Sequence, residues 1–574
     1  MAASTHWLAS QSAMAVLERG GNAFDAAVAG GFVLQVVEPH LNGPGGDLVG
    51  LVAPVGEPPK VLAGLGAAPR GASVESYRAL GLELVPGAGL LAATAPGAFD
   101  AWLLLLRDHG TWELDEVLEY ALYYAELGYP VIPAISRTIG SVADLFGESW
   151  STSADAWLID GRPLAAGSIH TRPVWAATLR RLLSSAPTDS RESRIDGVRN
   201  EWSRGFVAKA IDEFARSAWR DSSGADHAGV ITAQDVADYS ASWESPVSID
   251  FRGHTVIKAG AWTQGPALLQ SLAILDGFDD ERLDPSTALG VHTILEVLKL
   301  ALADRDAWYG DSGTTPLDIL LSPEYAATRR ALVTDVASAD LRPGRPAGRE
   351  PRIPVPQPGS ERKYGSAAGA GEPTVARDGT TRGDTCHIDI ADSEGNLVSI
   401  TPSGGWLQSS PHIPELGFCL GSRLQMTWLE DDLPSSLRPG QRPRTTLSPS
   451  MLLKDGRAVL AFGTPGGDQQ DQWQLPFLLR YLVGGYELQQ AIDAPTFHTT
   501  SANESFWPRE RVPGGAVVED RLGDEVIAEL DARGHDITVS GPWTLGRISA
   551  VSVADDGLRA GANPRGAQGY AVGR

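Results

Sequence analysis

The chain has 574 residues, of which 43% are apolar and 21% are charged, the composition of an ordinary globular protein. Because 47 Lys and Arg face 71 Asp and Glu, the net charge of −24 argues against nucleic acid or an anionic membrane as a partner. The two cysteines, Cys386 and Cys419, cannot build a disulfide framework and fit a reducing compartment.

The N-terminal segment is predicted to hold two helices, over residues 10–19 and 24–37. Gly20-Gly21 fits a helix stop, and Asn22 is a plausible cap for the second helix. The first residues lack the basic region of a secretory signal, and no apolar run reaches the roughly 20 residues of a membrane span. We therefore expect a cytoplasmic protein. The Gly-rich turn at 42–47 lacks the Lys-Ser/Thr of a phosphate loop, so it does not indicate a nucleotide site.

The middle of the chain alternates between helical and strand-like patterns. Residues 102–183 are mainly helical, residues 243–261 are strand-like, and residues 267–275 and 292–308 have apolar positions at helical spacing. Residues 341–383 are dense in Pro, Gly, Arg and Ser, which makes them the best linker candidate in the chain.

The C-terminal third is predicted to be rich in β-structure. Residues 387–391 and 397–401 flank a polar turn, as do residues 451–453 and 458–462, which indicates two hairpins. Thr464-Pro465-Gly466-Gly467 follows the second hairpin, ahead of a helix over residues 471–483. Such a turn can present backbone N–H groups to a developing oxyanion, although a plain tight turn is the more common reading of an isolated Pro-Gly-Gly.

Thr385 begins the first of these strands, directly behind the linker candidate. Cleavage before it would free its α-amine, which could act as general base for its own hydroxyl. The alternative is that Thr, a favoured strand residue, simply starts a strand.

The eleven His are scattered without HExxH or CxxC spacing, so we predict no metal and no cofactor. There is also no G-x-S-x-G elbow of an α/β-hydrolase.

Ordered motifs along nearly the whole chain resemble the γ-glutamyltranspeptidase family of N-terminal-nucleophile hydrolases. The matching segments are Leu8-Ala9-Ser10-Gln11, residues 20–27, Val37-Glu38-Pro39-His40, Gly43-Pro44-Gly45-Gly46, Ala95-Pro96-Gly97, Gly128-Tyr129-Pro130-Val131, residues 292–311, Asp384-Thr385-Cys386-His387, residues 442–449 and Thr464-Pro465-Gly466-Gly467.

The resemblance implies an α+β fold, a four-layer αββα sandwich, built as one intertwined domain. The chain would cleave itself between Asp384 and Thr385. A large subunit, residues 1–384 with a flexible linker at about 341–383, and a small subunit, residues 385–574, would stay together as an αβ unit, with α2β2 as an alternative.

The resemblance also implies catalytic roles. Thr385 would attack a carbonyl to form an acyl-enzyme, while its α-amine moves the proton through water. Ser403 stands where the family usually has a Thr that hydrogen-bonds the nucleophile. The amides of Gly466 and Gly467 would form the oxyanion hole. Cys386 replaces the family's second Thr, and a small buried hydrophobe is the preferred interpretation over a second nucleophile.

The departures from the family concern recognition of the glutamyl group. Leu65 aligns with the Arg that pairs with the α-carboxylate, and Gly405 aligns with an Asn that helps bind the α-ammonium. The family's acidic residues fall at residues 425–428, which contain no carboxylate, while Thr445 and Thr446 replace its paired Ser. Burying an unpaired charge costs several kcal/mol, so we expect glutamyl recognition to be lost or changed.

Trp406, Arg423 and Trp428 are candidates for the altered acyl pocket, with ordinary packing as the alternative. The leading hypothesis is an autoprocessing amidohydrolase or acylase that acts on a small-molecule, non-glutamyl amide or acyl substrate. The alternatives are a genuine glutathione or γ-glutamyl hydrolase-transferase, and a specialised biosynthetic hydrolase that could cleave C–C bonds. A non-enzymatic binding protein is disfavoured, because Thr385, Ser403 and the Gly pair are all retained.

Overall fold

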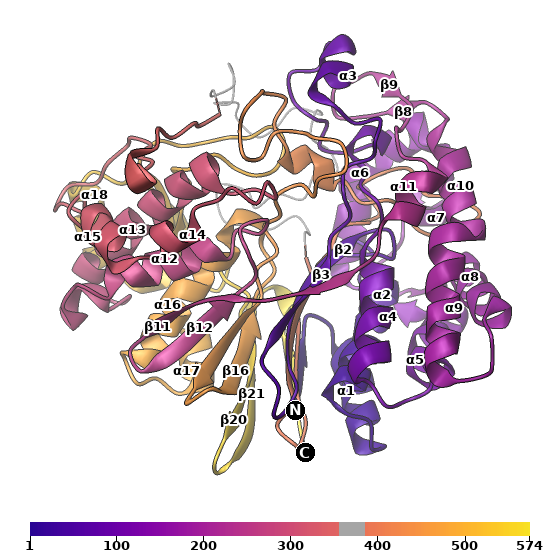
Figure 1. The fold of residues 1–574 in the computed structure, drawn as a ribbon, viewed down its shortest axis with the longest axis horizontal. Coiled ribbons are helices and arrows are strands. Elements are labelled where there is room, and N and C mark those ends of the chain that lie inside the picture. The colour runs from indigo at the N-terminus through magenta and orange to yellow at the C-terminus, as the bar shows by residue number, and fades with distance from the viewer. Residues whose placement is uncertain (355–384) are drawn as a thin grey trace.

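The computed structural model describes residues 1–354 and 385–574. Two sheets lie side by side, and each has a group of helices next to it (Figure 1). Helices α1, α2 and α4 to α11 share an apolar core with the seven-stranded sheet, whereas α12, α13 and α15 to α18 share one with the six-stranded sheet. Among the described residues, no helix combines the length and apolarity needed to cross a membrane.

The seven-stranded sheet joins strands from both ends and the middle of the chain. Its order is β10 (Ser242–Glu244), β3 (Lys60–Gly64), β2 (Asp47–Ala53), β14 (Leu397–Ser403), β13 (Ile388–Ala391), β1 (Ala2–Ser4) and β22 (Tyr570–Val572). Neighbouring strands are antiparallel. The N-terminal strand β1 therefore lies between β13 and the C-terminal strand β22, and both chain ends emerge together in Figure 1.

The six-stranded sheet is also antiparallel. Its order is β11 (Val247–Phe251), β12 (His254–Lys258), β15 (Ser450–Lys454), β16 (Arg457–Gly463), β20 (Ser549–Ala554) and β21 (Gly557–Ala562). The smaller sheets are β17 (Phe497–Thr499), β18 (Gly515–Glu519) and β19 (Asp536–Ser540), and the pairs β4 (Tyr129–Pro130) with β7 (Ile169–His170), β5 (Leu158–Ile159) with β6 (Arg162–Pro163), and β8 (Trp219–Arg220) with β9 (Asp226–His227).

Helices cover the outer faces. Those that pack with the seven-stranded sheet are α1 (Trp7–Glu18), α2 (Ala23–Val37), α4 (Ala98–His109), α5 (Leu114–Leu127), α6 (Pro133–Ser149), α7 (Ser151–Trp157), α8 (Pro173–Ser185), α9 (Arg191–Arg204), α10 (Phe206–Ala215) and α11 (Ala233–Asp238). Those that pack with the six-stranded sheet are α12 (Pro266–Leu275), α13 (Ala288–Trp308), α15 (Pro323–Arg330), α16 (Gln470–Leu482), α17 (Leu488–Asp493) and α18 (Asp524–Ala532). Two short helices pack elsewhere: α3 (Val74–Ala79) with Leu424 and Leu429, and α14 (Leu317–Leu320) with Trp308 and Tyr309.

The alternation of side chains along β2 explains why the sheet is buried on both faces. Leu48 and Val52 belong to the core that the first sheet shares with its helices, whereas Val49 and Leu51 belong to a cluster with residues of the second sheet. Successive side chains of a strand point to opposite faces, so a strand that is apolar after its first residue, Asp47, needs cover on both sides.

Most elements predicted from the sequence are confirmed. The two N-terminal helices are present as α1 and α2, and Asn22 caps α2 in a reciprocal capping box with Asp25. Both predicted hairpins form, as β13–β14 and β15–β16. The mixed α+β class is confirmed. Of the linker candidate, residues 341–354 are described and contain a short 3-10 turn at Pro346–Gly348; the remainder, with Asp384, lies outside the described residues.

Candidate functional site

Thr385 lies three residues before β13, where its backbone forms an isolated antiparallel bridge with that of Ser403. The two hydroxyl oxygens are 3.3 Å apart, and both side chains are about 1% exposed. The amide of Cys386 donates to the carbonyl of Pro402 at 3.0 Å, so the β13–β14 ladder continues to the end of the strand. The predicted partner of the nucleophile is therefore held within hydrogen-bonding distance by regular strand pairing.

A row of buried polar side chains runs from Thr385 along the face between the two sheets. His387 contacts the hydroxyl of Thr401 at 2.8 Å and the carboxylate of Asp389 at 2.9 Å. Ser549, on β20 of the second sheet, donates to Asp389 at 3.0 Å. The row ties the two sheets together behind the site. Sequence reasoning missed it, although polar residues at every second position were a visible signal.

The Gly-rich turn before β2 is explained by close backbone contact. A Cβ on Gly46 would lie 2.2 Å from the carbonyl oxygen of Ser403, and a Cβ on Gly43 would lie 2.4 Å from that of Gly405. Gly405 itself has φ +64°, in the left-handed region. These glycines let the turn pack directly against the segment that follows Ser403.

Arg423 and Trp406, two candidates for the acyl pocket, lie beside the same segment, and both make contacts within the protein. Arg423 makes a two-point ion pair with Asp47, whose backbone pairs with Ser403. Burial raises the pKa of Asp47, and the guanidinium opposes that shift. The indole nitrogen of Trp406 donates to the carbonyl of Leu41 at 2.6 Å. The charge of Arg423 is therefore already neutralised.

The Gly466–Gly467 turn follows β16 and precedes α16. The two residues have φ +120° and +32°, and a Cβ on Gly466 would lie 2.3 Å from the ring of Trp473. Gly463, at the end of β16, packs against the imidazole of His387, where a Cβ would approach to 2.3 Å. The end of β16, which leads into the predicted oxyanion turn, therefore packs against His387, two residues after Thr385.

The remaining predicted substrate-binding residues lie in two different environments. Leu65 belongs to an apolar cluster between the sheets. The carbonyl of Thr445 accepts from the amide of Gln264, whose side chain donates to the carbonyl of Gly467 at 3.2 Å. The hydroxyl of Thr446 is buried and has no hydrogen-bond partner among the described residues. Thr445 is therefore connected to the oxyanion turn, whereas Leu65 is part of the apolar packing between the sheets.

Cys386 is buried beside the carboxyl group of Glu38. Its thiol donates to Glu38 at 3.1 Å, and the hydroxyl of Thr5 donates to the same oxygen at 2.6 Å. Burial raises the pKa of Glu38 to about 7 and raises the pKa of the Cys386 thiol. A protonated, enclosed thiol is a poor nucleophile, which agrees with reading Cys386 as a packing residue.

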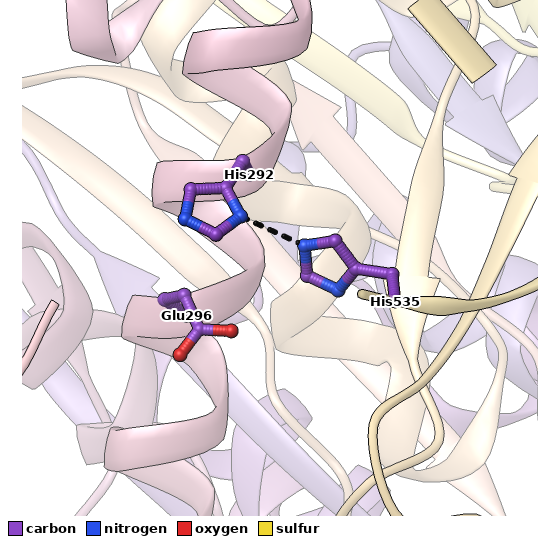
Figure 2. A group of neighbouring side chains, drawn as sticks. All are labelled: His292, Glu296 and His535. Atoms are coloured by element: carbon purple, nitrogen blue, oxygen red, sulfur yellow. Dashed lines mark hydrogen bonds between the residues drawn. The ribbon is translucent and has the colours of Figure 1, made fainter. Parts of the chain in front are cut away.

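His292, Glu296 and His535 form a buried group whose ligand atoms could hold a metal ion. Figure 2 shows the two imidazoles joined by a hydrogen bond, 2.9 Å long. Glu296 already accepts from Arg342 at 2.8 Å and pairs with Lys299. Because two cations neutralise this carboxylate and burial lowers the pKa of His535 to about 3, the contacts indicate a neutral imidazole pair that packs α13 against the chain before β19.

A family model described as Gamma-glutamyltranspeptidase matches residues 9–573. The chain belongs to this family, and the resemblance drawn from its motifs is confirmed. The two curated relatives described below are both named as proenzymes, and both align with essentially the full chain.

Two curated relatives are similar over this length. The chain is 29% identical to the glutathione hydrolase-like YwrD proenzyme of Bacillus subtilis, covering 100% of this chain and 98% of the relative. It is also 29% identical to the oxamate amidohydrolase proenzyme of Klebsiella pneumoniae, again over 100% and 98%. Among solved structures, LmbA2991HD superimposes with a TM-score of 0.94 at 52% identity, covering 100% of this chain and 98% of the other.

Proposed function

We propose that the protein is an autoprocessing amidohydrolase or acylase that forms its acyl-enzyme on Thr385. The observation that carries this proposal is the placement of Thr385 just before β13, with its hydroxyl 3.3 Å from that of Ser403. Membership of the family and the proenzyme relatives support self-cleavage between Asp384 and Thr385. The four-layer αββα arrangement is part of the proposal, supported by separate cores on either side of a third, inter-sheet cluster.

In the proposed reaction, cleavage frees the α-amine of Thr385, which takes the hydroxyl proton through water as the oxygen attacks the substrate carbonyl. The amides of Gly466 and Gly467 stabilise the oxyanion. Ser403 orients the nucleophile. Water or an amine then releases the acyl group, and the large and small subunits remain associated because the seven-stranded sheet contains strands from both.

We further propose that the acyl group is not a γ-glutamyl group. Leu65 lies among apolar side chains, Gly405 has no side chain, and Arg423 is neutralised by Asp47. No one of these positions offers the free cation or amide that glutamyl recognition requires. The second candidate is γ-glutamyl hydrolysis, favoured by the name of the Bacillus relative.

An intact-mass measurement of freshly purified protein tests the proposal. Two fragments that break before Thr385 are expected in the wild type, and a single chain without turnover is expected in Thr385→Ala. Cys386→Ala is the matched control and should still be cleaved. Turnover that survives in Thr385→Ala would refute the mechanism. A γ-glutamyl anilide then separates the two candidates, since its rapid hydrolysis would favour the second.

A further inference from the structure

Three buried arginines, Arg305, Arg444 and Arg509, lie near Asp468, which follows the Gly466–Gly467 turn, and their hydrogen bonds are unequally satisfied. Arg305 is saturated by Asp306, Asp468 and two further oxygens. Arg444 makes a single hydrogen bond, to the hydroxyl of Ser505 at 2.8 Å, and its Nε and Nη1 have no partner among the described residues.

Arg509 is the second arginine with an open donor. Its Nη2 donates to the carbonyls of Thr427, at 2.8 Å, and Gln425, whereas its Nη1 has no partner in the described part of the chain. Its guanidinium lies 4.2 Å from the centre of the Trp428 ring. Arg444 and Arg509 are each only 3% exposed, so water does not satisfy these donors from the surface.

The two aspartates in this cluster, Asp306 and Asp468, both form ion pairs with Arg305. Asp306 accepts two hydrogen bonds from it, at 3.0 and 3.1 Å, and lies 4.0 Å from Arg444. Asp468 accepts from Arg305 and from Ser505. Among the described residues, Arg444 therefore has only the distant carboxylate of Asp306 and Arg509 makes no ion pair, although Oδ2 of Asp306 accepts no hydrogen bond there.

The electrostatics show that burial and the neighbouring arginines disfavour the charged forms of Arg444 and Arg509. Burial, followed by the charge of Arg305, lowers the pKa of Arg444 to about 10; burial, followed by Arg444, lowers the pKa of Arg509 to about 9. Both remain protonated at neutral pH. Buried charges are ordinarily paired, so the cluster is set up to receive an anion.

The cluster is connected to the predicted catalytic groups. Ser505, the partner of Arg444, precedes Phe506, and a Cβ on Gly467 would lie 2.9 Å from the Phe506 ring. Phe506 packs in turn with Trp406, three residues after Ser403. Asp468, which directly follows Gly467, faces both Arg305 and Arg444. Asp468 therefore joins the predicted oxyanion turn directly to the arginine cluster.

We propose that Arg444 and Arg509 form the anion-recognition subsite of the acyl pocket, and that the substrate carries a carboxylate which these two guanidiniums bind. This inference rests on the proposed function for the position of the reacting carbonyl. Guanidiniums suit the task because their planar donors match a carboxylate at two points. Trp406 and Phe506 would then form the apolar wall beside the charged group.

Calorimetric titration of the self-cleaved protein with small amide acids and neutral isosteres tests the inference. The probe pairs are oxamate against pyruvamide and succinamate against succinamide. We expect at least one acid to bind and its neutral partner not to bind. In Arg444→Gln and Arg509→Gln that acid should bind roughly tenfold or more weakly, since hydrogen bonds to charged groups are the strong ones. Arg444→Lys should retain part of the affinity.

Arg511→Gln is the matched control, because its guanidinium donates instead to the carbonyls of Ser501 and Ala339 at 2.9 and 2.8 Å. It should bind the acid as the wild type does. Normal self-cleavage with equal binding, or none, of acids and neutral partners would overturn the inference and leave the proposed function standing. Acid binding that survives in both Gln variants would also overturn it. Absence of cleavage at Thr385 would instead count against the proposed function.

Discussion

The guanidinium of Arg423 forms a two-point ion pair with the carboxylate of Asp47, with Nε–Oδ2 and Nη2–Oδ1 distances of 2.6 and 2.8 Å. Both side chains are 3% exposed. Asp47 begins β2 and pairs through its backbone with Ser403 at the end of β14. The ion pair therefore ties the N-terminal and C-terminal parts of the chain together beside the predicted nucleophile.

Removing one partner of this ion pair should lower the stability of the folded protein more than removing both partners. Arg423→Met leaves the carboxylate buried without a partner, a loss of about 3–5 kcal/mol for a buried pair. The double variant with Asp47→Leu should recover part of that loss. Unfolding midpoints measured in the uncleaved Thr385→Ala background give the comparison. A double variant no more stable than Arg423→Met would contradict this account.

The hydroxyl of Ser403 should matter for rate and not for stability. Ser403→Ala is expected to slow self-cleavage and turnover roughly tenfold or more, because the nucleophile loses a hydroxyl that orients it. Ser403→Thr keeps the hydroxyl and should stay within a few-fold of the wild type. Time-resolved intact-mass spectra measure the cleavage. Equal rates in the Ala and Thr variants would remove Ser403 from the mechanism.

Gly466 should not tolerate a side chain. Its φ of +120° disfavours any L-residue, and a Cβ would meet the Trp473 ring at 2.3 Å. Gly466→Ala should therefore displace the turn and lower turnover by about 10²–10³, the usual effect of losing an oxyanion donor. Gly456→Ala is the control, since Gly456 has φ +77° in an open hairpin turn with nothing within 4 Å. Comparable losses in both variants would argue against a special role for Gly466.

The elements that could be predicted most accurately from the sequence are those set by short-range patterns of residues. Asn22 with Asp25, and the polar turn after Ala391, are short-range signals, and the elements they delimit are present. Strand β1 could not be predicted, because three residues carry no period and its partners lie near residues 390 and 572.

The difference between short-range signals and long-range contacts also applies to the candidate site. Thr385 stands in a motif, whereas Arg423 is paired by Asp47, 376 residues away. Arg444 lies inside a recognised motif, yet its open donors follow only from the positions of Ser505 and Asp306. Long-range pairing of this kind has no signal in a single sequence.

Glu38 should make stability fall as pH rises. Burial holds its folded-state pKa at about 7, above the ordinary value of 4.5, so the folded protein keeps a proton that the unfolded chain releases. The stabilisation is complete below about pH 4.5 and is lost progressively up to about pH 7. The total change is on the order of 3 kcal/mol at roughly 1.4 kcal/mol per pKa unit.

Glu38→Gln should remove this contribution, because the amide is neutral at every pH and still accepts from Thr5 and Cys386. In the Thr385→Ala background, the variant should therefore gain stability relative to its parent as pH rises from about 4.5 to about 7. Thr5→Val should act in the opposite sense, since the Thr5 hydroxyl favours the ionised carboxyl and its loss raises the pKa of Glu38 further. Unfolding midpoints across this pH range measure both effects. If the difference in unfolding midpoint between Glu38→Gln and its parent stayed constant across this pH range, Glu38 would ionise normally in the folded protein.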